Sequence, residues 1–370
     1  MRAAKKVPVR YDNLMPVMLA GKYNKSTYYT RCSDFWWNPE IIGLVQNSGT
    51  ADMPQQKFNH CVFLDYRSLD QGDLDPGPLR ELCQRFSSFD ETAPALTAER
   101  IADADVVISN KVVIDKAVMQ QCSQLRLICI AATGTNNVDM EAAKHLGISV
   151  ANVTGYATPS VVQHLFAGLL TLVTRLDSQR ELAIDGSWEA SPQFCVLPGS
   201  VGELAGMSMG IIGYGELGRA VAQTASCFGM QVMVAARPGG EVTGGRVSLE
   251  EMLATADIIS LHCPLADNTR NLIDAAALAH MPEHAILINT ARGGIVDEAA
   301  LADALIKGGL GGAVVDVLST EPPLDGNPLL DQEIPNLVLT PHTAWASVAS
   351  RQRLIEGIAA NMKAYLSDRR

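Results

Sequence analysis

The sequence lacks the features that mark several protein classes. Charged residues make up only 19% of the 370 positions and apolar residues 47%, which is typical of a folded protein. The net charge of −11 argues against nucleic acid as the main partner, because contacts with phosphates need clustered basic side chains. No apolar run approaches the roughly 18–20 residues of a membrane span. We therefore expect a soluble protein without a nucleic-acid or membrane partner.

Cysteine occurs at eight positions but forms no CxxC pair and no ligand-like spacing with histidine. Several cysteines lie inside apolar runs such as "RLICIAA", where a buried free thiol is the expected state. This pattern argues against a zinc-dependent dehydrogenase, and we expect no metal. It is typical of a reducing compartment, which predicts a cytoplasmic protein.

The first 52 residues differ from the rest of the chain. They carry seven Lys or Arg against four Asp or Glu, and half of all Tyr and Trp, without helical or strand periodicity. Three interpretations remain open: a start assigned upstream of Met53, a disordered arm, or a targeting peptide, for which "LMPVMLAG" is a poor apolar core. We predict an N-terminal extension over residues 1–56.

From residue 60 on, short apolar runs alternate with helical segments. The first series contains the strands "CVFLDY", "DVVISN", "RLICIAA" and "ISVANV" and the helices "GPLRELCQRF" and "DMEAAKHLG", the latter ended by Gly147. A long helix then begins with Thr158 as N-cap and Pro159 in its first turn. After a loop over residues 185–206, the second series contains "MSMGIIGYG", "MQVMVAA", "ADIISLHC", "HAILINTA", "GGAVVDV" and "NLVLTPH".

This alternation predicts βαβ units and parallel sheets. We expect an α/β protein with two doubly wound, Rossmann-like domains and a cleft between them. Residues 57–158 would form the first domain, completed by the last helix within residues 343–370. Residues 159–342 would form the second domain.

The segment Gly213-Tyr-Gly215-Glu-Leu-Gly218 ends a predicted strand and begins a predicted helix. Gly213 would allow the tight turn, Gly215 would let the backbone approach a pyrophosphate, and Gly218 would let the helix pack closely on the strand. A lone GxGxxG is weak evidence. In this strand–turn–helix context it predicts a dinucleotide site.

Ala236 stands where this fold usually carries an acid that binds the ribose hydroxyls. An alanine cannot accept those hydrogen bonds, whereas the guanidinium of Arg237 can pair with a 2′-phosphate. The alternative is an exposed arginine beside a Pro-Gly-Gly turn. Because the missing acid also removes repulsion against a phosphate, we predict NADP(H) in preference to NAD(H).

Four further residues lie at or just beyond strand ends: Arg292 in "INTARGG", Asp316 and Glu321 in "VVDVLSTEPP", and His342 in "LTPHTAWAS". Strand ends of this kind line the ligand crevice of an open α/β sheet. Taken singly, each has a structural explanation as a surface charge, a loop acid or a turn histidine. Together, an Arg that grips a carboxylate and a His–Glu pair that moves a proton predict hydride transfer to a 2-oxo acid.

These segments together resemble the D-isomer-specific 2-hydroxyacid dehydrogenases. The similarity runs from about residue 60 to the end and also includes "SLHCPL", "ISNKVVIDKAVM" and "AATGTNNVDMEAAKHLGISVANVTGYATPSVVQH". Among the branches of the family, the sequence is most similar to the glycerate dehydrogenases, also called hydroxypyruvate reductases. It departs from the family pattern at Ala236, and at Asn136, where relatives commonly have Asp.

The resemblance implies that residues 57–158 with 343–370 form the substrate (catalytic) domain and that residues 159–342 form the dinucleotide-binding domain. It also implies a role for each of these positions. Arg292 would anchor the substrate carboxylate, Glu321 would pair with the histidine, and His342 would donate and accept the proton. The remaining histidines, among them His164 on the linking helix, are not expected to be catalytic. The substrate would also contact Asn110, Lys111, Thr133, Gly134 and Thr135. The cofactor would lie along Gly213, Gly215, Glu216, Leu217, Gly218, Ala236, Arg237, His262, Cys263, Pro264, Thr290, Ala291, Arg292, Asp316, His342 and Ala344.

The resemblance further implies reversible reduction of hydroxypyruvate or glyoxylate to D-glycerate or glycolate. It implies a homodimer formed through the nucleotide domain, and the segment "DGSWEASPQFCVLPG" is a candidate arm that reaches the partner. Two alternatives remain open. One is an enzyme similar to phosphoglycerate dehydrogenase, which would need extra cations for the phosphate. The other is a non-catalytic NAD(H)-sensing protein of the corepressor kind, built on the same fold.

Overall fold

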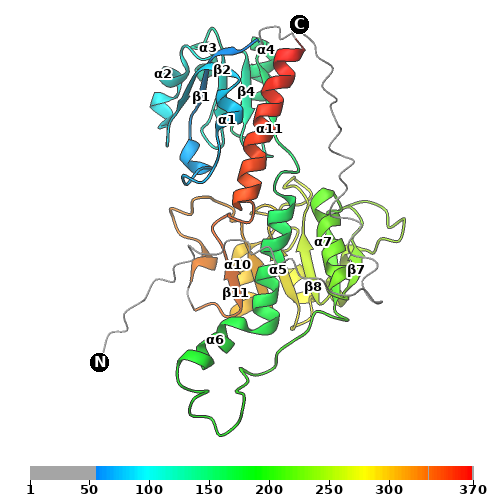
Figure 1. Ribbon diagram of the computed structural model, residues 1–370. Coiled ribbons are helices and arrows are strands. Elements are labelled where there is room, and N and C mark those ends of the chain that lie inside the picture. Colours follow the sequence, from blue (N-terminus) through cyan, green and yellow to red (C-terminus); the bar gives the residue numbers. More distant parts are fainter. Residues whose placement is uncertain (1–55, 332, 369–370) are drawn as a thin grey trace, which may run out of the picture. The chain divides into compact units, whose positions relative to one another are not determined.

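The computed structural model describes residues 56–331 and 333–368, which form two parallel sheets (Figure 1). The first sheet has the order β2-β1-β3-β4-β5. Its strands are β1 (Phe58–Phe63), β2 (Cys83–Ser88), β3 (Val106–Ser109), β4 (Leu127–Ile130) and β5 (Ser149–Asn152). The second sheet has the order β11-β10-β9-β8-β6-β7. Its strands are β6 (Ser208–Ile212), β7 (Gln231–Val234), β8 (Ile258–Leu261), β9 (Ile286–Asn289), β10 (Gly312–Val315) and β11 (Leu337–Leu339).

Helices cover both faces of the first sheet, because its strands are apolar on both sides. Phe63, Ile108 and Cys129 face one core, and their neighbours along the strands face the other. The first core also contains residues of α1 (Gly77–Arg80) and α11 (Val348–Ser367). The second contains residues of α2 (Thr97–Ile101), α3 (Lys116–Gln120) and α4 (Met140–Leu146).

The second sheet is covered in the same way. Its cores include α5 (Thr158–Thr174) and α7 (Glu216–Cys227) on one face, and α8 (Leu249–Thr255), α9 (Ala275–His280) and α10 (Glu298–Ile306) on the other (Figure 1). Helix α5 approaches the sheet closely at Gly168, where an added Cβ would lie 2.6 Å from Val314 Cγ1. A short helix, α6 (Leu176–Ile184), follows α5 after Arg175, which has a φ of 51°. The predicted fold class is therefore confirmed.

Two local predictions are wrong. The segment "GPLRELCQRF" is not one helix: α1 ends at Arg80, and residues 83–88 form β2, the edge strand that pairs with β1. Pairing with a neighbouring strand outweighs the helical propensity of this segment. Thr158 is not an N-cap either. The helix already includes it, the N-cap is Ala157, and the Thr158 hydroxyl donates instead to Glu216 Oε1 at 2.7 Å.

Gly147 ends α4 in the left-handed conformation with a φ of 71°, as predicted. The predicted extension over residues 1–56 lies outside the described residues apart from Gln56. The domain boundaries at 158/159 and 342/343, and the cleft, stay predictions. Within the part of the chain that the structure describes, no helix is both long and apolar enough to cross a membrane.

Candidate active site

The glycine turn between β6 and α7 has the geometry of a phosphate site. Gly213 has a φ of 97°, and a Cβ there would lie 2.5 Å from the carbonyl carbon of His262. A Cβ at Gly218 would lie 2.1 Å from Gly213 O. Only glycine fits at either position. Helix α7 begins after Gly215, and among the described residues no side chain caps it, which leaves its first N–H groups for an anion.

Glu216 and Leu217, which lie between Gly215 and Gly218, offer their backbone rather than their side chains to a ligand. The carboxylate of Glu216 accepts the hydroxyl of Thr158, and the side chain of Leu217 packs against the core shared with α5. Both were predicted to contact the cofactor. Because their side chains are engaged elsewhere, the N–H groups at the helix start are what remains for a pyrophosphate.

Two buried polar atoms on the second sheet have no hydrogen-bond partner within the described residues. They are His262 Nδ1 and Thr290 Oγ1, and both residues were predicted to lie along the cofactor. Burial lowers the pKa of His262 to about 4, so the ring is neutral at pH 7. Buried polar groups without partners are rare in proteins and indicate a ligand or water. The turn and these atoms fit a bound dinucleotide.

Two arginines from different segments lie close to the end of β7. Ala236 is buried and donates its N–H to Val247 O, while the side chain of Arg237 is exposed beside the turn that Gly240 closes. Arg246 returns to the same place, and its Nη1 donates to Ala235 O at 2.9 Å. Two guanidinium groups therefore lie near the position where the fold usually has an acid. Arg246 was not predicted from the sequence.

A tight turn after β9 presents Arg292. The buried side chain of Asn289 donates to Arg292 O at 2.9 Å and accepts the N–H of Ala291 at 3.1 Å. Gly293 allows the turn, because a Cβ there would lie 2.0 Å from Leu318 O. Arg292 is exposed and lies beside the loop after β4, where a Cβ added to Gly134 would be 3.4 Å from its Nη2.

The loop after β4 has backbone N–H donors that lie near Arg292. Among the described residues, no acceptor is found for the N–H groups of Thr133, Gly134 and Thr135. Nearby, burial raises the pKa of Tyr156 to about 12, although the charge of Arg292 lowers it. Free N–H groups beside a guanidinium form a site for a carboxylate.

His342 and Glu321 form a hydrogen-bonded pair. His342 Nδ1 lies 2.6 Å from Glu321 Oε2, and Glu321 Oε1 accepts the N–H of Leu318 at 2.8 Å. Burial raises the pKa of Glu321, but these hydrogen bonds and the charges of His342 and Lys111 outweigh it and lower the pKa overall. The ionised carboxylate at neutral pH orients the ring and stabilises the imidazolium. The other ring nitrogen, Nε2, is left for a substrate.

Asp316 holds the backbone around His342 in place. Its buried carboxylate accepts the N–H groups of Thr343 and Ala344, both at 2.9 Å, and the hydroxyl of Thr340. His342 itself has a φ of 56°, an uncommon conformation for a residue other than glycine. The side chain of Asp316 therefore positions the histidine loop.

Comparison with known proteins identifies the family. The model described as "D-isomer specific 2-hydroxyacid dehydrogenase, NAD binding domain" matches residues 166–344. A glycerate dehydrogenase from Methylorubrum extorquens is 40% identical over 311 residues, which cover 83% of this chain and 96% of that protein. A hydroxypyruvate reductase from Blautia hydrogenotrophica is 37% identical and covers 82% of this chain and 96% of its own length. The chain belongs to the D-isomer-specific 2-hydroxyacid dehydrogenase family.

A solved structure agrees with this assignment. The NADPH-dependent glyoxylate/hydroxypyruvate reductase from Sinorhizobium meliloti, in complex with citrate, has a TM-score of 0.69 and 26% identity, and the match covers 84% of this chain and 95% of that one. The predicted family is therefore confirmed. The chain is an oxidoreductase of this family with a domain for a nicotinamide cofactor.

Asn110 and Lys111, the two residues of the loop after β3 that were predicted to contact the substrate, differ in whether their side chains are exposed. Asn110 is buried, and its N–H and side-chain amide donate to Asp65 and Ser68. The side chain of Lys111 is exposed and lies close enough to Glu321 for its charge to lower the pKa of that carboxyl. Of these two residues, only Lys111 has a side chain that is exposed to a ligand, because the Asn110 amide is bonded to Ser68.

Besides Arg246, three residues that support the site were not predicted from the sequence. Asn289 shapes the Arg292 turn, and Trp345 Nε1 donates to His342 O at 2.9 Å. Asp65 binds the loop after β3. The motifs "INTARGG" and "HTAW" contain the first two, but only the folded backbone shows which carbonyls they contact. His164, which is not expected to be catalytic, has its Nε2 3.0 Å from Thr340 Oγ1.

Proposed function

We propose that this chain reduces a small 2-oxo acid, hydroxypyruvate or glyoxylate, to D-glycerate or glycolate with NADPH, without a metal. The observation that carries the proposal is the placement of Arg292 beside free N–H groups of Thr133–Thr135, together with the His342–Glu321 pair. The names of the relatives, glycerate dehydrogenase and hydroxypyruvate reductase, agree with this substrate class.

The substrate carboxylate would lie between Arg292 and the loop after β4. The planar guanidinium can donate two parallel hydrogen bonds, and the N–H groups of residues 133–135 supply further donors. Arg292 would also polarise the adjacent carbonyl group. With the carboxylate and the carbonyl oxygen both bound, 2-oxo acids can differ only in the remaining group on the carbonyl carbon.

The proton would come from His342. Because Nδ1 faces Glu321, the imidazolium carries its transferable proton on Nε2. A nicotinamide held beside this site would supply the hydride. As the carbonyl carbon receives the hydride, Nε2 gives its proton to the carbonyl oxygen, and the product is a hydroxyl rather than an alkoxide. The reverse reaction uses the same nitrogen as a base.

The preference for NADP(H) rests on the end of β7. Arg237 is exposed beside the buried Ala236, and Arg246 is anchored to Ala235 O. A 2′-phosphate would gain two cationic partners here and would meet no carboxylate at position 236. The similar enzyme from Sinorhizobium meliloti is described as NADPH-dependent.

Replacing Arg237 with Ala should raise the KM for NADPH by about tenfold or more and leave the KM for NADH within about twofold, because only NADPH carries the 2′-phosphate. Initial rates with each cofactor at saturating hydroxypyruvate measure this. Lys307→Ala is the control, since Lys307 is an exposed cation paired with Asp303 on α10. Equal losses for both cofactors would show that Arg237 does not recognise the phosphate.

The homodimer is also proposed here. Several apolar side chains after α5 are exposed, with Phe194 91% and Leu197 72% accessible. Ile184 and Trp188 are exposed on the same segment. Exposed apolar clusters of this kind mark protein interfaces, and we propose that a second copy covers this one. Sedimentation analysis at micromolar concentration should give a dimer, and a monomer would contradict it. The cytoplasmic location stays a prediction from cysteine usage.

A kinetic matrix tests the proposed function. NADH and NADPH are each paired with hydroxypyruvate, glyoxylate, pyruvate and 3-phosphohydroxypyruvate, and the absorbance of the cofactor is followed. We expect the highest kcat/KM for NADPH with hydroxypyruvate or glyoxylate. The highest value with the phosphorylated acid would favour an enzyme similar to phosphoglycerate dehydrogenase. Cofactor binding without turnover of any acid would favour the non-catalytic sensor.

A further inference from the structure

Asp65 follows β1, and its carboxylate points at the loop after β3. Oδ1 accepts the N–H of Asn110 at 2.9 Å, and Oδ2 accepts those of Lys111 at 2.6 Å and Val112 at 3.3 Å. Asp65 is only 7% exposed. Consecutive N–H groups that converge on one point form a nest that binds anions. Here an internal carboxylate occupies the nest.

The nest lies where this kind of sheet binds ligands. In the order β2-β1-β3-β4-β5, β1 and β3 are neighbours whose chain connections leave to opposite sides. The crevice at the carboxyl ends of two such strands is the usual ligand site of a doubly wound sheet. Because Asp65 fills the nest, the N–H groups of residues 110–112 are not available to a substrate. The loop contributes through the side chain of Lys111.

The loop that Asp65 holds is itself hydrogen-bonded to the loop after β4. Asn137 Nδ2 donates to Val112 O at 3.1 Å, and Ile114 donates its N–H to Asn137 O at 2.8 Å. Asn137 lies two residues after the segment 133–135, whose N–H groups have no acceptor among the described residues. The loops after β3 and β4 are therefore joined, and Asp65 fixes the first of them.

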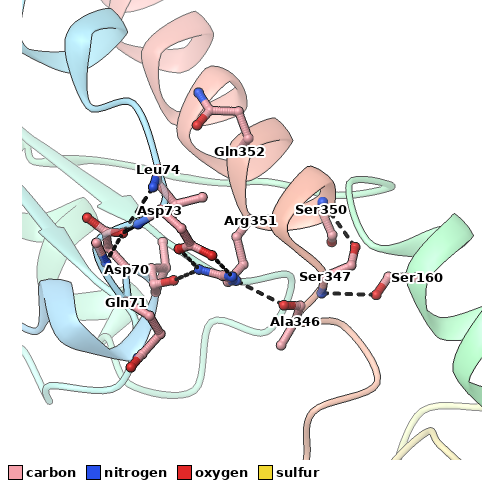
Figure 2. Close-up of polar contacts among 12 residues, drawn as sticks. Asp70, Gln71, Asp73, Leu74, Ser160, Ala346, Ser347, Ser350, Arg351 and Gln352 are labelled. Atoms are coloured by element: carbon pink, nitrogen blue, oxygen red, sulfur yellow. Dashed lines mark hydrogen bonds and ion pairs between the residues drawn. The ribbon is translucent and has the colours of Figure 1, made fainter. Parts of the chain in front are cut away.

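A buried arginine on α11 anchors the loop after β1 to the segment that follows β11 (Figure 2). Arg351, only 8% exposed on α11, donates to Leu69 O at 2.7 Å and to both oxygens of Asp73 at 2.7 Å. Its Nε donates to Ala346 O at 2.9 Å, four residues after His342. One buried guanidinium thus connects the loop after β1 to the segment that follows the catalytic histidine.

We propose that Asp65 is a positioning residue for the 2-oxo acid: it holds residues 110–112 so that the Lys111 ammonium lies beside the substrate carboxylate. The proposal rests on the proposed function of the site. The short bond from the Lys111 N–H fixes the direction in which this side chain leaves the backbone. The side chain lies close enough to Glu321 to lower its pKa.

Replacing Asp65 with Asn tests this. One acceptor oxygen becomes an NH₂ group that faces N–H donors, so the loop loses part of its nest. The KM for hydroxypyruvate should rise about tenfold while kcat and the Kd for NADPH stay within about twofold, because binding of the acid is weakened equally in the ground state and the transition state, and His342 and Glu321 keep their hydrogen bond. A loss confined to kcat, or an unchanged KM, would overturn the proposal.

Asp70→Asn is a matched control on the same loop. Asp70 Oδ1 accepts three consecutive N–H groups, those of Gly72 at 2.8 Å, Asp73 at 2.9 Å and Leu74 at 3.1 Å (Figure 2). The substitution therefore removes a similar nest that does not lead to Lys111. The KM for hydroxypyruvate should stay within about twofold of wild type. An equal rise in both variants would show that Asp65 serves only the stability of the loop.

Two measurements keep the proposal separate from the proposed function and from folding. Amide hydrogen exchange in the wild type should be slower for residues 110–112 than for 133–135, and this result does not depend on turnover. Fast exchange at residues 110–112 would contradict the claim that Asp65 binds their N–H groups. Inactivity with every 2-oxo acid would contradict the proposed function alone. If Asp65→Asn does not fold, Lys111→Met replaces an exposed side chain and should itself raise the KM about tenfold. An unchanged KM would contradict the role of Lys111.

Discussion

Replacing His342 with Ala should lower kcat for hydroxypyruvate reduction by about 10²–10⁴-fold, the range that a positioned general acid contributes. The Kd for NADPH should stay within about twofold, because the phosphate turn at Gly213–Gly218 and the end of β7 are separate elements. Stopped-flow turnover and fluorescence titration with NADPH measure the two quantities on the same preparation.

Two comparisons support the interpretation of that result. His145→Ala is the control, since His145 is exposed on α4 and should leave kcat unchanged. Glu321→Gln keeps a hydrogen-bond acceptor near Nδ1 but removes the charge that stabilises the imidazolium, so its kcat should lie between wild type and His342→Ala. Turnover of His342→Ala near the wild-type value at neutral pH would show that another group delivers the proton.

Replacing Arg292 with Ala should lower kcat/KM for the 2-oxo acid by about 10²–10³-fold, comparable to removing one donor from an oxyanion site. The loss should appear in both KM and kcat, because the guanidinium would bind the carboxylate and also polarise the carbonyl group. Arg292→Lys should recover only part of the rate, since an ammonium group cannot make two parallel hydrogen bonds. Steady-state kinetics with hydroxypyruvate measure each value.

Lys144→Ala, which removes an exposed cation from α4, is the control for net charge. The Kd for NADPH should be unchanged in Arg292→Ala if the residue serves the acid rather than the cofactor. A kcat/KM that stays within a few-fold of wild type would mean that the carboxylate is bound elsewhere. The free N–H groups of residues 133–135 would then need a different partner.

The sequence predicts most of the fold because buried parallel strands are continuous apolar runs. The glycine turn at Gly213–Gly218 can also be predicted from the sequence. At Gly213 and Gly218 any Cβ would collide with backbone atoms, so only glycine is accepted there. A requirement this strict can be recognised in a single sequence. The order of strands and helices in the second domain follows from these two signals.

The errors arise where local and tertiary preferences differ. Residues 83–88 have the composition of a helix surface, and in the edge strand β2 only Cys83 is buried, so no alternation marks the strand. Thr158 is a favourable N-cap residue by type, but its hydroxyl finds a better partner in Glu216, 58 positions away. A single sequence does not show which distant partner a side chain will reach.

The candidate site shows the same limit. Arg292, Glu321 and His342 could be predicted because each follows a strand end in a family motif. Asp65 could not be, since its partners are 45 to 47 residues further along the chain and a lone Asp after a strand has many uses. Chemistry-bearing residues are therefore easier to predict than the residues that position them.

The measurement that tests the account most directly is the identity of the product. The protein is incubated with NADPH and hydroxypyruvate, the fall in absorbance at the NADPH band is recorded, and the glycerate is resolved by chiral chromatography. We predict one D-glycerate formed for each NADPH oxidised. The absence of NADPH oxidation with both hydroxypyruvate and glyoxylate, or formation of L-glycerate, would contradict the account.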